Sequence, residues 1–457
     1  MNRTAVLDVV GLTSALVERM PRVRQFVRGR EMRRIVPTFP AVTCTAQSTY
    51  LTGLTPGEHG IVGNGWYDRD LAEVHFWKQS NHLVRGLKLW EELREKIPGF
   101  TCAKLFWWYN MYSTVDYSIT PRPIYPADGR KFFDIYTAPF DIRFAIKKDL
   151  GEFPFRSFWG PGSGIQSSRW IADSAKWIEQ HYRPNLSLVY LPHLDYNLQK
   201  IGPNDPGIEA DLRLLDDLLG DLISFFEQRE IQLVILSEYG ITGVDHPISI
   251  NRVLRKQGWI AIKDELGLEM IDCGASKVFA VADHQVAHVY VNDLRLLGEA
   301  RSVLQSQEGI EAVLDREQRV SLGINHPRAG DLVAIAGPRS WFTYYYWLDD
   351  QRAPDFARTV DIHRKIGYDP AELFIDPAIK FPAARVAAFL LKKKLNLRGL
   401  LAVIPLDPTL VKGSHGRVPE RVEDHPVIIA DRLASVPDAI RATNVYGLLR
   451  AVCLGTD

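Results

Sequence analysis

A run rich in hydroxyl side chains carries the clearest chemical signal in the sequence. Residues 37–64 read PTFPAVTCTAQSTYLTGLTPGEHGIVGN. Prolines end the preceding segment, so a helix is predicted to begin near Thr43, and Gly53 is placed to end it. A hydroxyl at a helix amino terminus faces unpaired N–H groups and the positive end of the dipole. That setting suits a nucleophile attacking phosphorus, whereas the plainer interpretation is that Thr43 only caps the helix.

Three acidic residues stand at or just beyond the ends of apolar, strand-like runs. They are Asp8, Asp195 and Glu238. Ligands of open α/β sheets bind at the carboxyl edge of the strands, so these side chains are candidates for one site. Three converging carboxylates repel one another unless a cation lies between them. The alternative is three unrelated loop acids.

The elements that would position these residues alternate along the chain. The expected strands lie at 5–10, 102–106, 186–191 and 232–236, and the expected helices at 14–28, 87–96, 170–182 and 208–228. Further strand-like runs follow at 278–281, 286–291 and 332–336. The alternation predicts an α/β fold with a central, mostly parallel sheet flanked by helices.

One domain is expected to use the whole chain, residues 1–457. The stretch 107–164 is rich in aromatic residues, proline and glycine and has no long periodic segment, so it is predicted to be a lid inserted over the core. A second irregular region covers 342–385.

Bulk composition excludes several classes of function. Lys plus Arg equals Asp plus Glu at 55 each, so no nucleic-acid polymer or membrane partner is expected. The four cysteines are scattered and are expected to be reduced thiols. The first residues lack the apolar core of a signal peptide, which favours a cytoplasmic protein, unless the true start lies upstream. No oligomeric state follows from the sequence.

With these motifs in place, the chain resembles the nucleotide pyrophosphatase/phosphodiesterase branch of the alkaline phosphatase superfamily. Its members have a strand ending in Asp near the amino terminus, which Asp8 matches. Their nucleophilic threonine begins a helix that leads into a TGL-x-P-x-x-HGI block and a following Asn. Thr43, residues 52–61 and Asn64 match that pattern, and Asn64 falls on the donor to a phosphate oxygen.

Three later motifs of the family follow in the expected order. An Asp in a segment ending in Gly-Pro is matched by Asp195 in 191–203. The S-D-H-G element reads SEYG at 237–240, and the G-x-H-G element reads GSHG at 413–416. The resemblance implies an alkaline-phosphatase-like core.

The resemblance also implies two divalent metal ions, which are zinc in the family. One site would be formed by Asp195, Gln199 and His415, and the other by Asp8, Thr43, Glu238 and Tyr239. The family has histidine where this chain has Gln199 and Tyr239, and aspartate where it has Glu238. The amide of Gln199 and the phenol of Tyr239 are harder donors than imidazole. A site built from them and from carboxylates therefore favours manganese or magnesium relative to zinc.

Four other residues are candidates for supporting roles. His284 and His288 are four apart and fall on one side of either a strand or a helix, so they could form an additional metal pair. Two hydrogen-bonded structural histidines are the alternative. Trp107 and Trp108 follow an expected strand end and could stack on a base or leaving group, or else form the core of the lid.

By this resemblance, the expected function is metal-dependent hydrolysis of a phosphodiester or pyrophosphate bond through a phosphothreonine intermediate. The substrate would be a small, nucleotide-like molecule. The alternatives are a phosphomonoesterase, phosphonate hydrolase or phosphotransferase on the same fold, a binding protein with a degraded metal site, or an unrelated α/β protein.

Overall fold

The computed structural model describes residues 2–395, 397, 399–431, 433 and 436–456. Within these residues a nine-stranded sheet forms the centre of the molecule, in the order β21-β2-β20-β9-β1-β8-β5-β6-β7. Its strands are β1 (Thr4–Val9), β2 (Glu31–Val36), β5 (Cys102–Leu105), β6 (Tyr117–Pro121), β7 (Ile135–Ala138), β8 (Leu186–Leu191), β9 (Gln232–Leu236), β20 (Val427–Ala430) and β21 (Ala439–Arg441). The run from β9 through β1, β8 and β5 to β6 is parallel, which confirms the predicted sheet.

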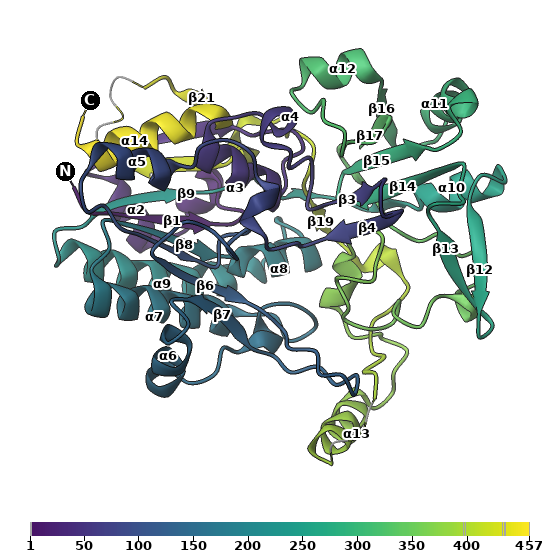
Figure 1. Cartoon of the computed structure of the whole chain (residues 1–457), viewed down its shortest axis with the longest axis horizontal. Coiled ribbons are helices and arrows are strands. Elements are labelled where there is room, and N and C mark those ends of the chain that lie inside the picture. Colours follow the sequence, from purple (N-terminus) through teal and green to yellow (C-terminus); the bar gives the residue numbers. More distant parts are fainter. Residues whose placement is uncertain (1, 396, 398, 432, 434–435, 457) are drawn as a thin grey trace.

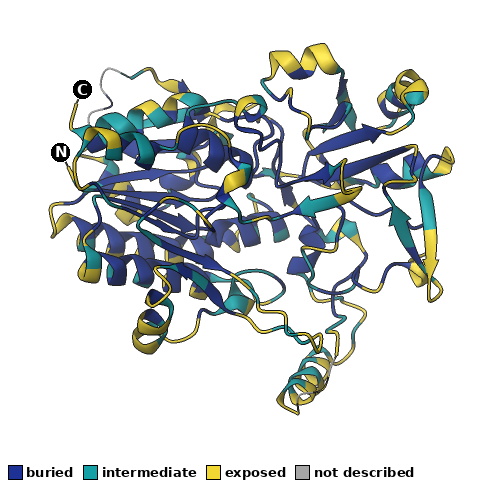
Figure 2. Cartoon of the chain, in the orientation of Figure 1, coloured by how far each residue is buried: buried dark blue, intermediate teal, exposed yellow. Residues whose placement is uncertain are grey.

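Helices cover both faces of this sheet (Figure 1). One layer contains α3 (Thr43–Thr52), α5 (Leu89–Lys96) and α14 (Val445–Leu454), and the other contains α2 (Pro21–Val27), α7 (Ile165–Tyr182), α8 (His193–Lys200) and α9 (Ile208–Glu227). Because both faces are covered, β1 and β8 are buried at every position (Figure 2). The helix expected at 14–28 is two helices, α1 (Ser14–Val17) and α2, because Pro21 suits only a first turn.

A second sheet lies between β9 and β20 in the chain. Among the described residues it has four strands in the order β14-β15-β17-β16, all antiparallel. They are β14 (Val278–Asp283), β15 (Val286–Val291), β16 (Ile310–Leu314) and β17 (Leu332–Ala336). The three strand-like runs noted in the sequence are therefore strands, but they form a separate sheet with its own core around Phe279, Tyr290 and Trp347.

Shorter elements complete the fold. The small strand pairs are β3 (Gly65–Asp68) with β4 (Glu73–Phe76), β10 (Thr242–Gly243) with β19 (Gly413–Ser414), β11 (His246–Ile248) with β18 (Ser340–Phe342), and β12 (Ala261–Glu265) with β13 (Leu268–Asp272). The other α-helices are α4 (Pro56–His59), α6 (Ile142–Leu150), α10 (Ile250–Lys256), α11 (Leu297–Gln305), α12 (Arg316–Ser321) and α13 (Pro382–Lys394).

The stretch 107–164, predicted to be a lid, contains elements of the core fold. Its strands β6 and β7 extend one edge of the central sheet, and α6 packs against α7. The loop between β6 and β7 reaches towards α13 (Figure 1). Within the described residues, no helix combines the length and hydrophobicity needed to span a bilayer.

Candidate active site

The parallel strands bring the predicted acids together at one edge of the central sheet. Asp8 lies near the end of β1, Glu238 follows β9, and Asp195 lies in the first turn of α8, after β8. Since β1 pairs in parallel with both β8 and β9, the three carboxylates converge at the same edge. Asp8 and Glu238 are completely buried.

Thr43 is the first residue of α3, and its hydroxyl does not cap the helix. Instead, its Oγ1 lies 3.0 Å from the hydroxyl of Tyr239. The Tyr239 hydroxyl donates to Asp195 Oδ1 at 3.2 Å, so it accepts from Thr43. This chain of hydrogen bonds holds the hydroxyl of Thr43 beside the acids instead of on its own backbone.

Gln47 lies one helical turn after Thr43 and connects two of the acids. Its Nε2 donates to Asp8 Oδ2 at 3.1 Å and to Glu238 Oε1 at 2.6 Å. Its Oε1 accepts from the Trp108 N–H at 2.7 Å, which fixes the orientation of the amide. Sequence reasoning missed Gln47, although the spacing of four from Thr43 places it on the same helix face.

Burial and mutual repulsion alter the acidity of the three carboxyl groups. Burial, with the neighbouring Glu238 charge, raises the pKa of Asp8 well above its usual range. Burial raises the pKa of Glu238 to about 7. Burial and Glu238 together raise the pKa of Asp195 to about 7. Without a cation the ionised forms of these three groups are therefore disfavoured, and a cation bound between them would stabilise their negative charge.

The unpartnered atoms of these groups fit divalent cations. Asp8 Oδ1 and Glu238 Oε2 are buried and have no hydrogen-bond partner. His415 Nε2 is also unpartnered and lies 3.9 Å from Asp195 Oδ1. These atoms are two pairs of candidate metal ligands. No three His, Cys, Asp or Glu side chains of the described residues form a complete metal-holding group, so each cation would need further ligands from other nearby side chains, water or substrate oxygens.

The two residues that replace family histidines have hydrogen-bond roles. Tyr239 connects Thr43 with Asp195, as described above. Gln199 Oε1 accepts from the Tyr368 hydroxyl at 3.0 Å, and its Nε2 is unpartnered. Gln199 is fully buried. The sequence did not indicate that its partner Tyr368 belongs to the site.

Four rings contact one another in a row beside Thr43. The Tyr239 ring lies 3.6 Å from His415, His415 lies 3.7 Å from His284, and His284 lies 3.6 Å from Tyr368, measured between ring centroids. His415 Nδ1 donates to the carbonyl of Ala41, so its Nε2 carries a free lone pair. Burial holds the pKa of His415 and of His284 well below the usual value, so both rings are neutral.

His284 reaches the site from the tip of the β14–β15 hairpin. Its backbone is left-handed, with φ of 61°, and its Nδ1 lies 2.9 Å from Asp283 Oδ1. Its Nε2 is unpartnered and its side chain lines the cavity above Thr43. His288 is different, because its Nε2 lies 2.9 Å from the Val62 carbonyl and its Nδ1 accepts from the Gly330 N–H. Neither nitrogen of His288 is available to a metal.

Asn64 is anchored on both sides. Its Oδ1 accepts from the Cys44 N–H at 3.0 Å. Its backbone N–H and its Nδ2 both donate to the carboxylate of Asp283, at 2.8 and 3.0 Å. The second sheet therefore fixes this side chain, which lines the cavity together with Thr43.

The two tryptophans have different places. Trp107 is fully buried in the main core, and it is not among the described residues that line the cavity. Trp108 does line the cavity, and its ring lies 4.8 Å from that of Trp77. Of the expected stacking pair, only Trp108 faces the cavity.

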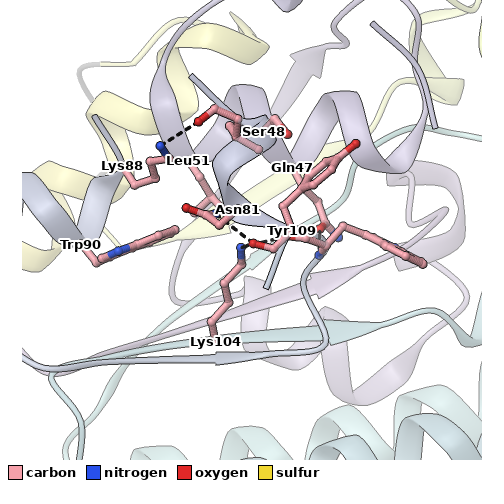
Figure 3. A pocket seen from close by; sticks show the side chains of 10 residues that line it. Gln47, Ser48, Leu51, Asn81, Lys88, Trp90, Lys104 and Tyr109 are labelled. Atoms are coloured by element: carbon pink, nitrogen blue, oxygen red, sulfur yellow. Dashed lines mark hydrogen bonds between the residues drawn. The ribbon is translucent and has the colours of Figure 1, made fainter. Parts of the chain in front are cut away.

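A small void of about 10 Å³ lies behind α3, with Gln47 and Ser48 on one side and Lys104 on another (Figure 3). Lys104 Nζ donates to the carbonyls of Trp108 and Tyr109, at 2.8 and 2.9 Å. Burial lowers the pKa of Lys104 to about 7. Lys104 thus fixes the backbone turn whose Trp108 N–H orients Gln47.

Comparison with known proteins gives the family. The model for type I phosphodiesterase / nucleotide pyrophosphatase matches residues 4–369. A pyrophosphatase/phosphodiesterase of Schizosaccharomyces pombe is 25% identical over 232 residues, which cover 48% of this chain and 39% of that protein. Ectonucleotide pyrophosphatase/phosphodiesterase family member 3 of Rattus norvegicus is 23% identical over 211 residues, covering 44% and 20%. The chain thus spans well under half the length of these relatives.

Solved structures share the fold. An inactive threonine-to-alanine variant of murine ectonucleotide pyrophosphatase/phosphodiesterase 5, in complex with AMP, matches with a TM-score of 0.59 and 15% identity, covering 100% of this chain and 96% of that one. Phosphonoacetate hydrolase from Sinorhizobium meliloti, in complex with phosphonoformate, matches with a TM-score of 0.63 and 13% identity, covering 99% and 96%. With the family model matched over most of its length, this chain belongs to the type I phosphodiesterase / nucleotide pyrophosphatase family.

Proposed function

We propose that the protein hydrolyses a phosphodiester or pyrophosphate bond with Thr43 as nucleophile. The observation that carries this proposal is the position of the Thr43 hydroxyl. It lies at the amino end of α3, is held by Tyr239 instead of capping the helix, and lines a large cavity above the acids of the parallel sheet. A hydroxyl held in this way is placed to attack a phosphorus atom in the cavity.

The surrounding side chains have separate roles in this proposal. Thr43 Oγ1 forms a bond to phosphorus as the ester oxygen leaves, and its proton moves towards Tyr239 and Asp195 along the existing hydrogen bonds. Asn64 has a second amide hydrogen beyond the one given to Asp283, and it would donate to a non-bridging oxygen. Water then cleaves the phosphothreonine to regenerate the hydroxyl.

Two divalent cations complete the proposal. Asp8 and Glu238, with Thr43, would hold one, and Asp195 and His415 would hold the other. When bound, such cations supply Lewis-acid activation of the hydroxyl and neutralise charge on the phosphoryl oxygens. His284 Nε2 is a candidate additional ligand, because it is unpartnered and its ring contacts that of His415. Manganese and magnesium suit this carboxylate-rich set, while zinc is the family's metal.

The direct test compares bis-p-nitrophenyl phosphate with p-nitrophenyl phosphate, after metal-free protein is incubated with Zn²⁺, Mn²⁺ or Mg²⁺. We expect turnover of the diester with at least one metal, and a loss of about 1,000-fold or more in the Thr43→Ala variant with its fold intact. Thermal unfolding gives a second readout, because a cation bound only by the folded state raises Tm.

Other outcomes point to the alternatives. Preference for the monoester would indicate a phosphomonoesterase, and cleavage of phosphonoacetate would indicate a phosphonate hydrolase. Wild-type activity in Thr43→Ala would refute the nucleophile. Protein that is inactive with all three metals, yet binds phosphate esters, would be a binding protein with a degraded metal site.

A further inference from the structure

The cavity above Thr43 is larger than a small phosphate ester requires. Its volume is about 1810 Å³, whereas sites for small molecules usually have roughly 300–1,000 Å³. It begins at Thr43, Asn64 and Tyr239 and continues to several residues between Thr359 and Val403, some of them in α13. A substrate that fills this space must extend well beyond the reacting phosphate.

The residues that line the cavity change from polar to apolar with distance from Thr43. Close to the nucleophile it is polar, with Asn64, Asp195 and Tyr239. The part formed by the β6–β7 loop, α13 and the residues after α13 is largely apolar and includes Ile124, Phe132, Phe133, Phe389, Leu390 and Leu401. An apolar group placed there would remove both surfaces from water, which is favourable.

Helix α13 forms the outer wall of this apolar part. All thirteen of its residues are described, and none is buried. The helix projects from the body of the molecule and is largely exposed (Figures 1 and 2). Phe389 and Leu390 line the cavity, whereas Leu391 is 58% exposed and does not. The apolar side of α13 is therefore turned towards the cavity without a core to cover it.

Lys393 holds this helix against the opposite wall. The Lys393 ammonium donates to the Lys131 carbonyl at 3.3 Å and lies 5.3 Å from the Phe133 ring centroid. The apolar space is thus enclosed between α13 and the β6–β7 loop. Lys78, Arg122, Arg156 and Lys394 also line the cavity and add positive charge. Positive charge together with an apolar wall suits a ligand that is anionic at one end and apolar at the other.

We infer that the substrate is a lipid phosphodiester, whose long apolar chain lies between α13 and the β6–β7 loop while its phosphate lies at Thr43. This inference rests on the proposed function and specifies its substrate class. A nucleotide would occupy only the polar part near Thr43 and would leave the apolar walls of the cavity in contact with water.

The first test varies only the chain. Methyl and octyl p-nitrophenyl phosphates share the same reacting group and are used as monomers, below micelle formation. We expect kcat/KM to be at least about 100-fold higher for the octyl ester, because each fully buried methylene contributes up to roughly fourfold. Equal kcat/KM for the two esters would overturn the inference while leaving the diesterase proposal standing.

The second test places a charge in the apolar part. Phe389→Glu is expected to lower the octyl-to-methyl ratio of kcat/KM at least about tenfold, because burying a carboxylate beside the chain is costly. Leu391→Glu is the matched control, since it adds the same charge to the same helix outside the cavity, and it should leave the ratio within about twofold. An equal effect of both substitutions would count against a chain-binding role for the cavity.

A binding measurement separates the two proposals if neither ester is cleaved. Titration calorimetry of wild-type protein with ethyl phosphate and dodecyl phosphate reads the chain site without turnover. Dodecyl phosphate that binds at least tenfold more tightly, with the difference lost in Phe389→Glu, would support the lipid site even though the hydrolase proposal had failed. Equal affinities in wild-type protein would reject the lipid site.

Discussion

Gln47 lies between two buried carboxylates that would otherwise repel each other. Its amide donates to both Asp8 and Glu238, and the Trp108 N–H prevents the amide from turning over. Replacement by glutamate keeps the size but removes both hydrogen bonds and adds another acid beside the two carboxylates. Gln47→Glu should therefore lower the free energy of unfolding by about 2–4 kcal/mol in metal-free protein, measured by urea denaturation.

Ser48→Ala is the control for this substitution. Ser48 is equally buried on α3, but its hydroxyl donates only to the Cys44 carbonyl of the same helix. We expect it to cost about 1 kcal/mol or less. Similar losses in the two variants would mean that the contacts of Gln47 with the acids contribute little.

The Tyr239 hydroxyl is the only atom of that side chain proposed to take part in proton movement. Tyr239→Phe removes the hydrogen bonds to Thr43 and Asp195 but keeps a ring that can stack on His415. We expect kcat for a diester to fall about 100-fold or more, with a small change in KM, since groups that assist proton transfer contribute roughly 10²–10⁴-fold.

Tyr344→Phe is the matched control, because Tyr344 is a fully buried tyrosine of the second core whose hydroxyl has no hydrogen-bond partner. Its kcat should equal that of the wild type. A Tyr239→Phe enzyme with undiminished kcat would show that Thr43 needs no proton path through this phenol.

At the scale of elements, the turn after β5 supports the site from behind α3. Lys104 in β5 holds the carbonyls of Trp108 and Tyr109, and both Phe106 and Tyr109 have positive φ, 64° and 54°. Such backbone conformations persist only where surrounding contacts hold them. Lys104 therefore connects the stability of this turn with the position of Gln47.

The depressed pKa of Lys104 predicts a pH dependence of stability. Its pKa is about 7 in the folded protein, against an ordinary value of 10.5. Between these values the unfolded chain binds the additional proton, so the unfolding free energy of the wild type should rise with pH. The slope from one such group is at most about 1.4 kcal/mol per pH unit.

Lys104→Met removes this titration. Urea denaturation between pH 7 and 10 should show that the difference in stability between wild type and variant grows with pH in favour of the wild type. A difference that stays constant across this range would mean that Lys104 titrates alike in both states. Diesterase activity of the variant should also fall, because the Trp108 N–H loses its support.

At the scale of the whole molecule, the sequence predicted those residues of the candidate site that lie at the ends of recognisable strands and helices. The acids could be placed because each follows an apolar run, and Thr43 because proline and glycine bound its helix. The partners of Gln47 and the stacking of Tyr368 on His284 depend on contacts between distant segments, which no local period reveals. The strands β14, β15 and β17 were recognisable, but their pairing in a separate sheet was not, because β17 pairs with β15 across the segment that contains α11, β16 and α12.

That second sheet contributes to the site through Asp283. Its carboxylate accepts both the backbone and the side-chain N–H of Asn64, so the two sheets together fix the proposed oxygen donor. Asp283→Ala should lower kcat/KM for a diester about 100-fold or more, as loss of one oxyanion donor does in other enzymes. Gln285→Ala is the control from the same hairpin, since the Gln285 amide donates to the Ser340 carbonyl in β18, and it should leave kcat/KM unchanged.

A double-mutant cycle tests whether Asp283 acts through Asn64. If Asp283 only positions Asn64, then Asn64→Ala should cost about as much as Asp283→Ala, and the double variant should cost no more than either alone. Additive losses would show that Asp283 acts independently of Asn64, for example through its contact with His284. Because Asp283 belongs to the second sheet, the size of this coupling measures how much that sheet contributes to the position of Asn64.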